Sequence, residues 1–189
     1  NMSLFQDGVN VLHDPADPEG LSKIARYFIG GILEHMRGIT AIANPLVNSY
    51  KRFVPGFEAP CNISWSLHNR SPLIRIPAIR GENTRIELRS PDPASNPYLL
   101  FAACLAAGLD GIRRQLDPGP SLNTNFYAMN AEERAARKIK DLPMSLQEAL
   151  DELEKDALMH EVLGEHVMEK YIASKRKEWG DYRKVVTQW

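Results

Sequence analysis

The segment from Asn96 to Leu116 most constrains the fold, because it is Ala-rich and apolar on most faces of the helix it predicts. Asn96 can cap that helix, and Pro97 suits its first position. The run Asp117-Pro118-Gly119 then ends the segment. A helix that is apolar on most faces has to be buried, so we expect this one to lie deep in the core.

A second helix is predicted from Leu21 to Ala43, where apolar residues broadly recur at helical spacing before Asn44-Pro45 ends the pattern. Gly30-Gly31 lies inside this pattern, where glycine costs helix stability. We therefore expect another backbone to pack closely against the glycine pair.

The chain opens on a short predicted strand, Asn1 to Phe5, which enters a turn at Asp7-Gly8. It does not begin with methionine, and no capping segment precedes the strand. We interpret this as a start in mid-domain, although processing or a cloning boundary would look the same.

The region between the two helices, residues 50–92, is rich in Pro and Arg and contains short alternating runs that are typical of strands. These runs are Cys61 to His68, Leu73 to Ala78 and Thr84 to Arg89. After Pro120 the chain becomes charged and helical, with capping-box patterns that begin at Asn130 and Ser145. The predicted fold class is α+β, with a partial antiparallel sheet packed against several helices.

The composition bounds the class of protein. The 189 residues are 43% hydrophobic, which suffices for one sizeable core and excludes a disordered or fibrous chain. The net charge of -1 gives no large field of one sign, so we expect neither nucleic acid nor a membrane as partner. Cys61 and Cys104 lack metal-ligand spacing and are predicted to be buried thiols in a reducing compartment. No segment predicts a membrane span or a signal peptide, so a cytoplasmic protein is expected.

The strongest chemical signal is the predicted strand from Thr84 to Arg89. Period-two geometry places Arg85, Glu87 and Arg89 on one face, and Arg75 projects from the equivalent face of the preceding strand. Guanidinium groups match phosphate and carboxylate oxygens, so converging arginines predict a polyanionic ligand, and Glu87 could bind a divalent cation that accompanies it. A solvated sheet face with ordinary cross-strand ion pairs is the alternative.

A loop before the strands adds to this signal. Lys51-Arg52 is followed by a Pro55-Gly56 turn and then by Glu58. An acid on such a loop could close over a bound substrate and accept a proton, although a plain surface turn would have the same letters.

Five ordered motifs closely resemble the C-terminal half of type I glutamine synthetase. They are NMSLF at Asn1, NPLVNSYKRFVPGFEAP at Asn44, NRSPLIRIP at Asn69, TRIELRSPDP at Thr84 and NPYLLFAACLAAGLDGI at Asn96. The resemblance implies half of that family's catalytic barrel. Residues 1–116 would be the C-terminal part of the catalytic domain, with its strands and two long helices, and residues 117–189 a helical C-terminal extension.

The resemblance also implies a reaction. In that family ATP phosphorylates the side-chain carboxylate of glutamate, and ammonia then displaces the phosphate to give glutamine. The family works as a dodecamer with two or three Mg²⁺ or Mn²⁺ ions in each site. The loop around Glu58 resembles the flap that closes the family's active site. Glu58 is therefore expected to help deprotonate ammonium, while the closed flap excludes water from the acyl phosphate.

The remaining roles follow from matching motifs. The resemblance implies that glutamate is bound by Arg52, Glu58, Arg70 and Arg89. It implies that ATP is bound by Asn1, Ser3, Arg70, Arg75 and Arg85. Catalysis is assigned to Glu58 and Arg70, and metal binding to Glu87. Tyr127 aligns with a tyrosine that some members adenylylate, but the residues after it depart from the pattern, so a structural role is the better interpretation.

The family's other metal ligands and its N-terminal β-domain do not occur in this sequence. We therefore expect the chain alone to bind Mg²⁺ weakly, to be inactive, and to self-associate or dissolve poorly. Two alternatives stay open: a non-catalytic anion-binding or regulatory paralogue, and a γ-glutamyl-amine ligase of the same superfamily. The Pro-Gly-aromatic-Glu-Ala-Pro loop around Glu58 favours ammonia over a larger amine as the acceptor.

Overall fold

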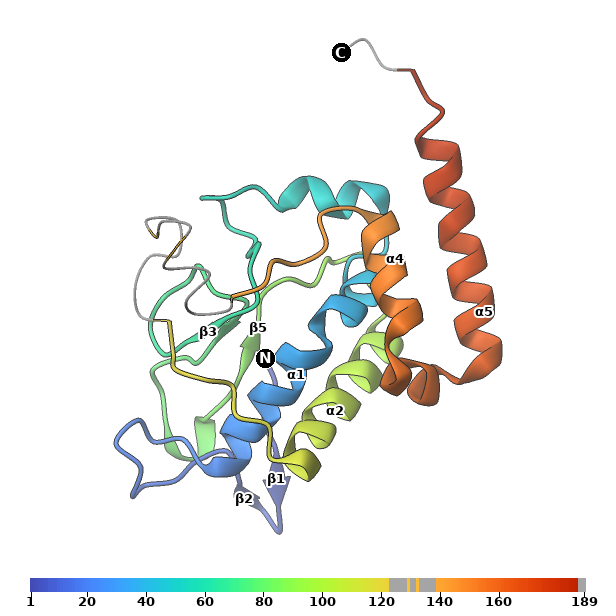
Figure 1. Cartoon of the computed structure of the whole chain (residues 1–189). Helices are drawn as coiled ribbons and strands as arrows, with labels where there is room; N and C mark the ends of the chain where they lie inside the picture. The colour runs from blue at the N-terminus through green and yellow to red at the C-terminus, as the bar shows by residue number, and fades with distance from the viewer. Residues whose placement is uncertain (123–128, 130–131, 133–138, 187–189) are drawn as a thin grey trace.

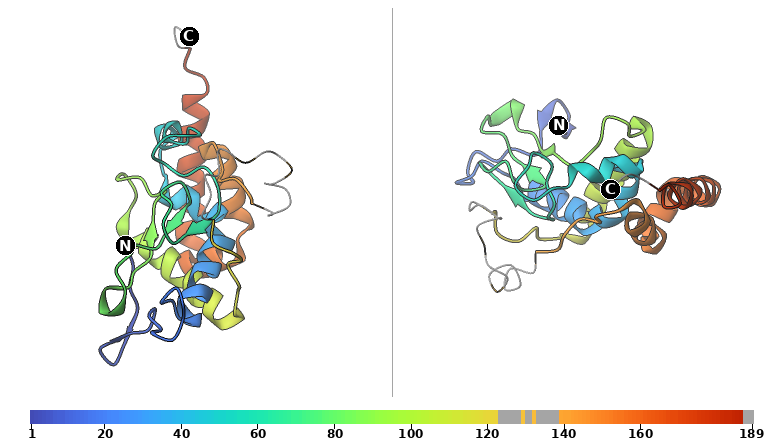
Figure 2. Two further views of the ribbon diagram at one scale, coloured as in Figure 1. Left: turned by 90° about the vertical axis from the view of Figure 1, so that its left-hand side faces the viewer. Right: turned by 90° about the horizontal axis from the view of Figure 1, so that it is seen from above.

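Two long helices form the centre of the molecule. The computed structural model describes residues 1–122, 129, 132 and 139–186. Helix α1 (Lys23–Ala43) lies beside α2 (Pro97–Arg114), as Figure 1 shows. Helices α4 (Leu146–Lys155) and α5 (Ala157–Tyr182) cover one side of this pair, and the small strands lie on the other (Figures 1 and 2). The fold is therefore α+β, as predicted.

The predicted helix starts are confirmed by their caps. Ser22 accepts a hydrogen bond from the N–H of Ala25, and Asn96 accepts from the N–H groups of Tyr98 and Leu99. Ser145 likewise accepts from Glu148 at the start of α4. Each cap satisfies backbone donors that the first helical turn leaves unpaired. The second predicted capping box, at Asn130, lies outside the described residues.

The glycine pair in α1 lies against other backbone, as predicted. A Cβ on Gly31 would stand 2.0 Å from the carbonyl oxygen of Ala107, and one on Gly30 would stand 2.1 Å from that of Leu116. The approach is reciprocal, because a Cβ on Gly111 would stand 2.1 Å from the carbonyl oxygen of Tyr27. Only residues without a side chain allow α1 and α2 to come this close.

The prediction that α2 is buried on most faces is wrong, because one of its apolar faces is exposed. Leu100, Ala103, Cys104 and Ala107 are buried against α1. A stripe on the opposite face is exposed and consists of Tyr98, Phe101, Leu105 and Leu109. The helix is apolar on two faces, and the described chain covers only one of them.

The strands are shorter than predicted and only partly antiparallel. A hairpin joins β1 (Phe5–Gln6) to β2 (Val9–Asn10) through the predicted Asp7-Gly8 turn, where both residues have positive φ. The second sheet has the order β3 (Trp65–Ser66), β4 (Ile74–Arg75) and β5 (Glu87–Leu88).

The expectation of an antiparallel sheet fails at β3 and β4, which are parallel, whereas β4 and β5 are antiparallel. After β3, the Ser66 hydroxyl accepts the N–H groups of His68 and Asn69, so the chain turns locally instead of closing a hairpin. The described strands form two small sheets and no closed barrel.

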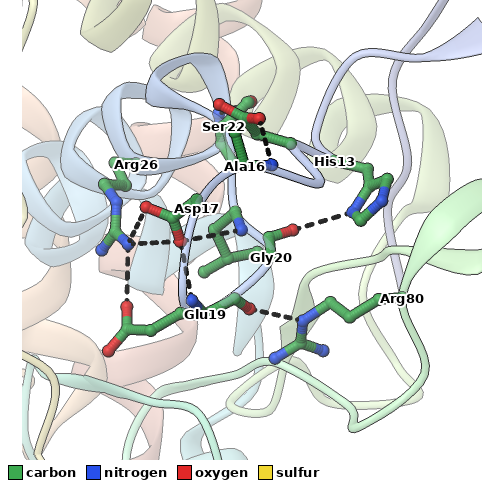
Figure 3. Close-up of polar contacts among 11 residues, drawn as sticks. His13, Ala16, Asp17, Glu19, Gly20, Ser22, Arg26 and Arg80 are labelled. Atoms are coloured by element: carbon green, nitrogen blue, oxygen red, sulfur yellow. Dashed lines mark hydrogen bonds and ion pairs between the residues drawn. The ribbon is translucent and has the colours of Figure 1, made fainter.

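The loop that leads from β2 into α1 is held by a charged cluster (Figure 3). Asp17 accepts the N–H groups of Glu19 and Leu21, and Arg26 pairs with Asp17 at 3.2 Å and with Glu19 at 2.8 Å. Burial alone would raise the pKa of Asp17, but these backbone donors and Arg26 outweigh it and lower that pKa. Arg80 donates to the carbonyl oxygen of Glu19 and so ties the loop to the segment before β5.

A histidine joins three of the helices. His35 in α1 lies between Asp156, which caps α5, at 2.9 Å and Asp110 of α2 at 3.1 Å. The hydrogen bond to Asp156 and then that to Asp110 raise the pKa of His35 against the opposing effect of burial. Asp110 also pairs with Arg114 at 2.8 Å.

Both cysteines are buried, as predicted, and neither forms a disulfide within the described residues. Burial raises the pKa of Cys104 to about 12. Among the described helices, none combines the length and the hydropathy that a membrane span requires.

Candidate active site

A hollow of about 500 Å³ opens at the surface where η1 (Val47–Arg52), the loop after it and the end of β5 meet. Its lining consists of Lys51, Arg52, Val54, Phe57, Glu58, Ala59 and Arg89. Three of the predicted site residues, Arg52, Glu58 and Arg89, therefore share one cavity, although Arg89 is distant in the sequence from the other two.

Element η1 carries Arg52 and is fixed by burial. Tyr50 is 7% exposed and packs edge-on against Phe53, with ring centroids 5.7 Å apart. Burial raises the pKa of Tyr50, so this side chain is a neutral part of the core. Arg52, next but one in the chain, is thereby placed at the rim of the cavity.

The guanidinium of Arg52 is anchored on one side. Its Nη1 donates to Asn44 Oδ1 at 3.3 Å and to the carbonyl oxygen of Ser90 at 3.2 Å, and it lies 3.8 Å from Asp92 Oδ2. The side chain is 35% exposed, so Arg52 is only partly buried by these contacts.

Arg89 connects the loop to the sheet. Its Nη2 donates to the carbonyl oxygen of Glu58 at 3.2 Å and stands 4.0 Å from the carboxylate of Glu58, which is fully exposed. Its Nε lies 3.4 Å from Glu87 Oε1. Its Nη1 is buried and finds no hydrogen-bond partner in the described part of the chain. An unsatisfied buried donor of this kind is costly unless a ligand accepts from it.

Glu87 lies between two arginines on the sheet. The register of β4 and β5 sets it opposite Arg75, whose Nη1 approaches its carboxylate oxygens at 3.1 and 3.3 Å. Arg89 approaches the same carboxylate from its own strand end. Arg75, Glu87 and Arg89 therefore form one ion-pair network beside the cavity.

The N-terminal segment borders this network. Met2 and Ile86 exchange two backbone hydrogen bonds of 2.8 and 2.9 Å in an antiparallel bridge. This pairing sets Asn1 beside Glu87 and Ser3 beside Arg85 along the two backbones. Ser3 also donates from its hydroxyl to the carbonyl oxygen of Thr84 at 3.1 Å.

The whole chain matches the model of the family described as "Glutamine synthetase, catalytic domain", over residues 1–189. The chain belongs to the glutamine synthetase family. It is 55% identical to the glutamine synthetase of Methanosarcina mazei and 52% identical to that of Thermotoga maritima over 189 residues. It spans 42% and 43% of the length of these relatives.

Solved structures show the same similarity. The structure named "GmaS/ADP complex-Conformation 1" superposes with a TM-score of 0.82 at 39% identity, over 95% of this chain and 41% of that one. The structure named "Apo GmaS without ligand" gives a TM-score of 0.81 at 40% identity, over 95% of this chain and 40% of that one. The fold of the described residues is thus that of glutamine synthetase family chains.

Two of the arginines matched to the family's motifs lie apart from the cavity. Arg70 is exposed in the segment before β4 and does not line it. Arg85 donates to the carbonyl oxygen of Asn83 at 3.3 Å, along its own chain and away from Glu87. Tyr127 lies outside the described residues.

Sequence reasoning missed the residues that hold Arg52. Asn44 was predicted only as part of a helix stop, and neither Ser90 nor Asp92 was singled out. Asn44 is fully buried, which is unusual for an asparagine that merely ends a helix. No periodicity in the sequence indicates which polar side chain it meets.

Proposed function

We propose that this chain forms the part of an ATP-dependent ligase that binds glutamate for conversion to glutamine through a γ-glutamyl phosphate. The observation that carries the proposal is the shared cavity of Arg52, Glu58 and Arg89. Two guanidinium groups around one hollow suit a dicarboxylate substrate, because guanidinium donors match carboxylate oxygens in charge and geometry.

In this proposal Arg52 and Arg89 hold the substrate glutamate. The buried, unpaired Nη1 of Arg89 supports the role, because a substrate oxygen would satisfy it. Fixed positive charge also lowers the barrier to phosphoryl transfer, where charge spreads over the phosphoryl oxygens. Arg70 is proposed to contact the transferred phosphoryl group.

Glu58 is proposed to take a proton from ammonium. It lies on an exposed loop beside Phe57, which is 73% exposed, so the loop has room to move over a bound substrate. Closure would bring the carboxylate to the acceptor and exclude water from the acyl phosphate. The nucleotide is proposed to lie along the strand edge formed by Asn1, Ser3, Arg75 and Arg85.

The described residues do not fit a complete site for Mg²⁺ or Mn²⁺. No group of three or more His, Cys, Asp or Glu side chains that could hold a metal occurs among them. Glu87 is instead paired with Arg75 and Arg89. We propose Glu87 as a single metal ligand of the assembled enzyme and assign no catalytic step to the ion.

The homo-oligomeric state, up to the family's dodecamer, and a cytoplasmic location are likewise proposed on family membership. Of the two alternatives, a non-catalytic anion-binding module predicts no product, and a γ-glutamyl-amine ligase predicts a γ-glutamyl amide of a larger amine.

A chimaera tests the proposal directly. Residues 1–189 would replace the matching 42% of the Methanosarcina mazei relative. With glutamate, ATP and ammonium, this protein should release glutamine and phosphate in equal amounts, and Glu58→Gln should lower turnover with little effect on the KM for ATP. Binding of ATP without turnover would favour the anion-binding module, and faster turnover with methylamine or putrescine than with ammonium would favour the γ-glutamyl-amine ligase.

A further inference from the structure

The anchoring of Arg52 is asymmetric. All of its contacts to described residues use Nη1, which meets Asn44 Oδ1, the carbonyl oxygen of Ser90 and, further away, Asp92. Within that part of the chain Nε and Nη2 have no hydrogen-bond partner. Arg52 lines the cavity, and this edge makes no hydrogen bond to the described residues.

We propose that Asn44 is a positioning residue that fixes Arg52 through Nη1 and so presents its Nε–Nη2 edge to the substrate carboxylate. The inference rests on the proposed function, because it assigns a purpose to an arginine that binds glutamate. It adds a residue that touches no substrate and acts through Arg52.

The position of Asn44 is itself rigid. It caps the C-terminus of α1, where its N–H donates to the carbonyl oxygen of Thr40 at 2.8 Å. The adjacent carbonyl, that of Ala43, accepts the N–H of Asp92 at 2.8 Å. The end of α1 and the segment after β5 are therefore joined at the point where both contact Arg52.

The amide of Asn44 is poorly satisfied as a structural group. Its Nδ2 is buried without a hydrogen-bond partner among the described residues, and so is the hydroxyl of Ser90. A buried donor without a partner reduces stability. A residue that only ends a helix has no need of a buried amide with an unpaired Nδ2. The loss of stability is explained if Asn44 is needed for the oxygen that holds Arg52.

A neutral acceptor suits this task better than a carboxylate. The oxygens within 3.3 Å of Arg52 belong to an amide and a peptide group, and both orient the guanidinium without cancelling its charge. The one carboxylate nearby, Asp92, lies 3.8 Å away and accepts the N–H of Ala94 with its other oxygen. An aspartate at position 44 would pair with Arg52 directly and compete with the substrate.

The first test uses the chimaera. Asn44→Asp should raise the KM for glutamate by roughly tenfold, as expected when a charge-assisted contact is lost, with the KM for ATP nearly unchanged. Asn62→Asp is the matched control, since Asn62 is also fully buried with an unpaired Nδ2, but its side-chain oxygen accepts from Ser64 and not from Arg52. An unchanged KM in Asn44→Asp, beside a raised KM in Arg52→Lys, would overturn this inference alone. An unchanged KM in Arg52→Lys would instead refute the proposed role of Arg52.

A second readout does not depend on activity. In the 189-residue chain, ¹⁵N spectra should show slow rotation of the Arg52 guanidinium, because two acceptors hold Nη1. Asn44→Ala should release that rotation, and Asn62→Ala should not. A freely rotating Arg52 in the unsubstituted chain, or one that Asn44→Ala leaves unchanged, would contradict the positioning role.

Discussion

The contact between α1 and α2 predicts that Gly31→Ala destabilises the chain. The new Cβ would stand 2.0 Å from the carbonyl oxygen of Ala107, whereas ordinary contact begins at 3.4 Å. The next nearest atoms, N and Cα of Gly111, are also backbone, so no side-chain rotation relieves the clash. The helices have to separate along the centre of the core.

The magnitude follows from two opposing effects. Overpacking costs about 1–3 kcal/mol, and a rigid backbone obstacle places this case near 3 kcal/mol. Alanine offsets about 1 kcal/mol of that cost through its higher helix propensity. The expected net loss is therefore about 2 kcal/mol in the free energy of unfolding, which lowers the urea midpoint by about 1 M at a typical slope.

Urea unfolding followed by circular dichroism measures this difference, with Gly180→Ala as the matched control. Gly180 also lies in a helix, but a Cβ there would meet no atom within 4 Å. The control should gain up to about 1 kcal/mol from helix propensity alone. If Gly31→Ala proved as stable as the unsubstituted chain, the account of the close helix contact would be refuted.

Three further predictions concern other parts of the molecule. Because the pKa of His35 is raised on folding, its contribution to stability is complete below about pH 6.5 and is lost as the pH rises through the folded value. His35→Gln should flatten that dependence in thermal melts between pH 6 and 9, and exposed His166→Gln should not. Leu105→Lys should reduce self-association in light scattering, because Leu105 lies in the exposed stripe of α2; a compact monomer before substitution would contradict this. Calorimetric titration of the chain with Mn²⁺ should show no site tighter than about 1 mM, and a tighter site lost in Glu87→Ala would refute the single-ligand account.

The helices could be predicted from the sequence because their signals are local. The caps at Asn96 and Ser145 and the glycine pair in α1 each depend on neighbouring residues or on the absence of a side chain. The exposed stripe of α2 could not be predicted, since an apolar face looks the same whether or not the described chain covers it. The parallel pairing of β3 and β4 was also missed, because alternation indicates a strand and not its direction.

In the candidate site, too, local spacing could be predicted from the sequence and contacts between segments could not. Period-two spacing predicted that Glu87 and Arg89 share a face, and the structure pairs them at 3.4 Å. The same spacing grouped Arg85 with them, yet this side chain donates to a carbonyl of its own segment. The acceptors of Arg52 follow no sequence period, since Asn44 lies at the end of the preceding helix and Ser90 after β5, so only the folded chain shows them.

Arg89 lines the cavity that is proposed to bind the carboxylates of glutamate, whereas Arg85 does not line it. The most direct measurement is the KM for glutamate in the chimaera with Arg89→Gln and, separately, Arg85→Gln. Loss of a charged contact to a carboxylate predicts a rise of about tenfold or more for Arg89→Gln, with the KM for glutamate nearly unchanged for Arg85→Gln. Equal effects of the two substitutions, or no effect of Arg89→Gln, would contradict the account.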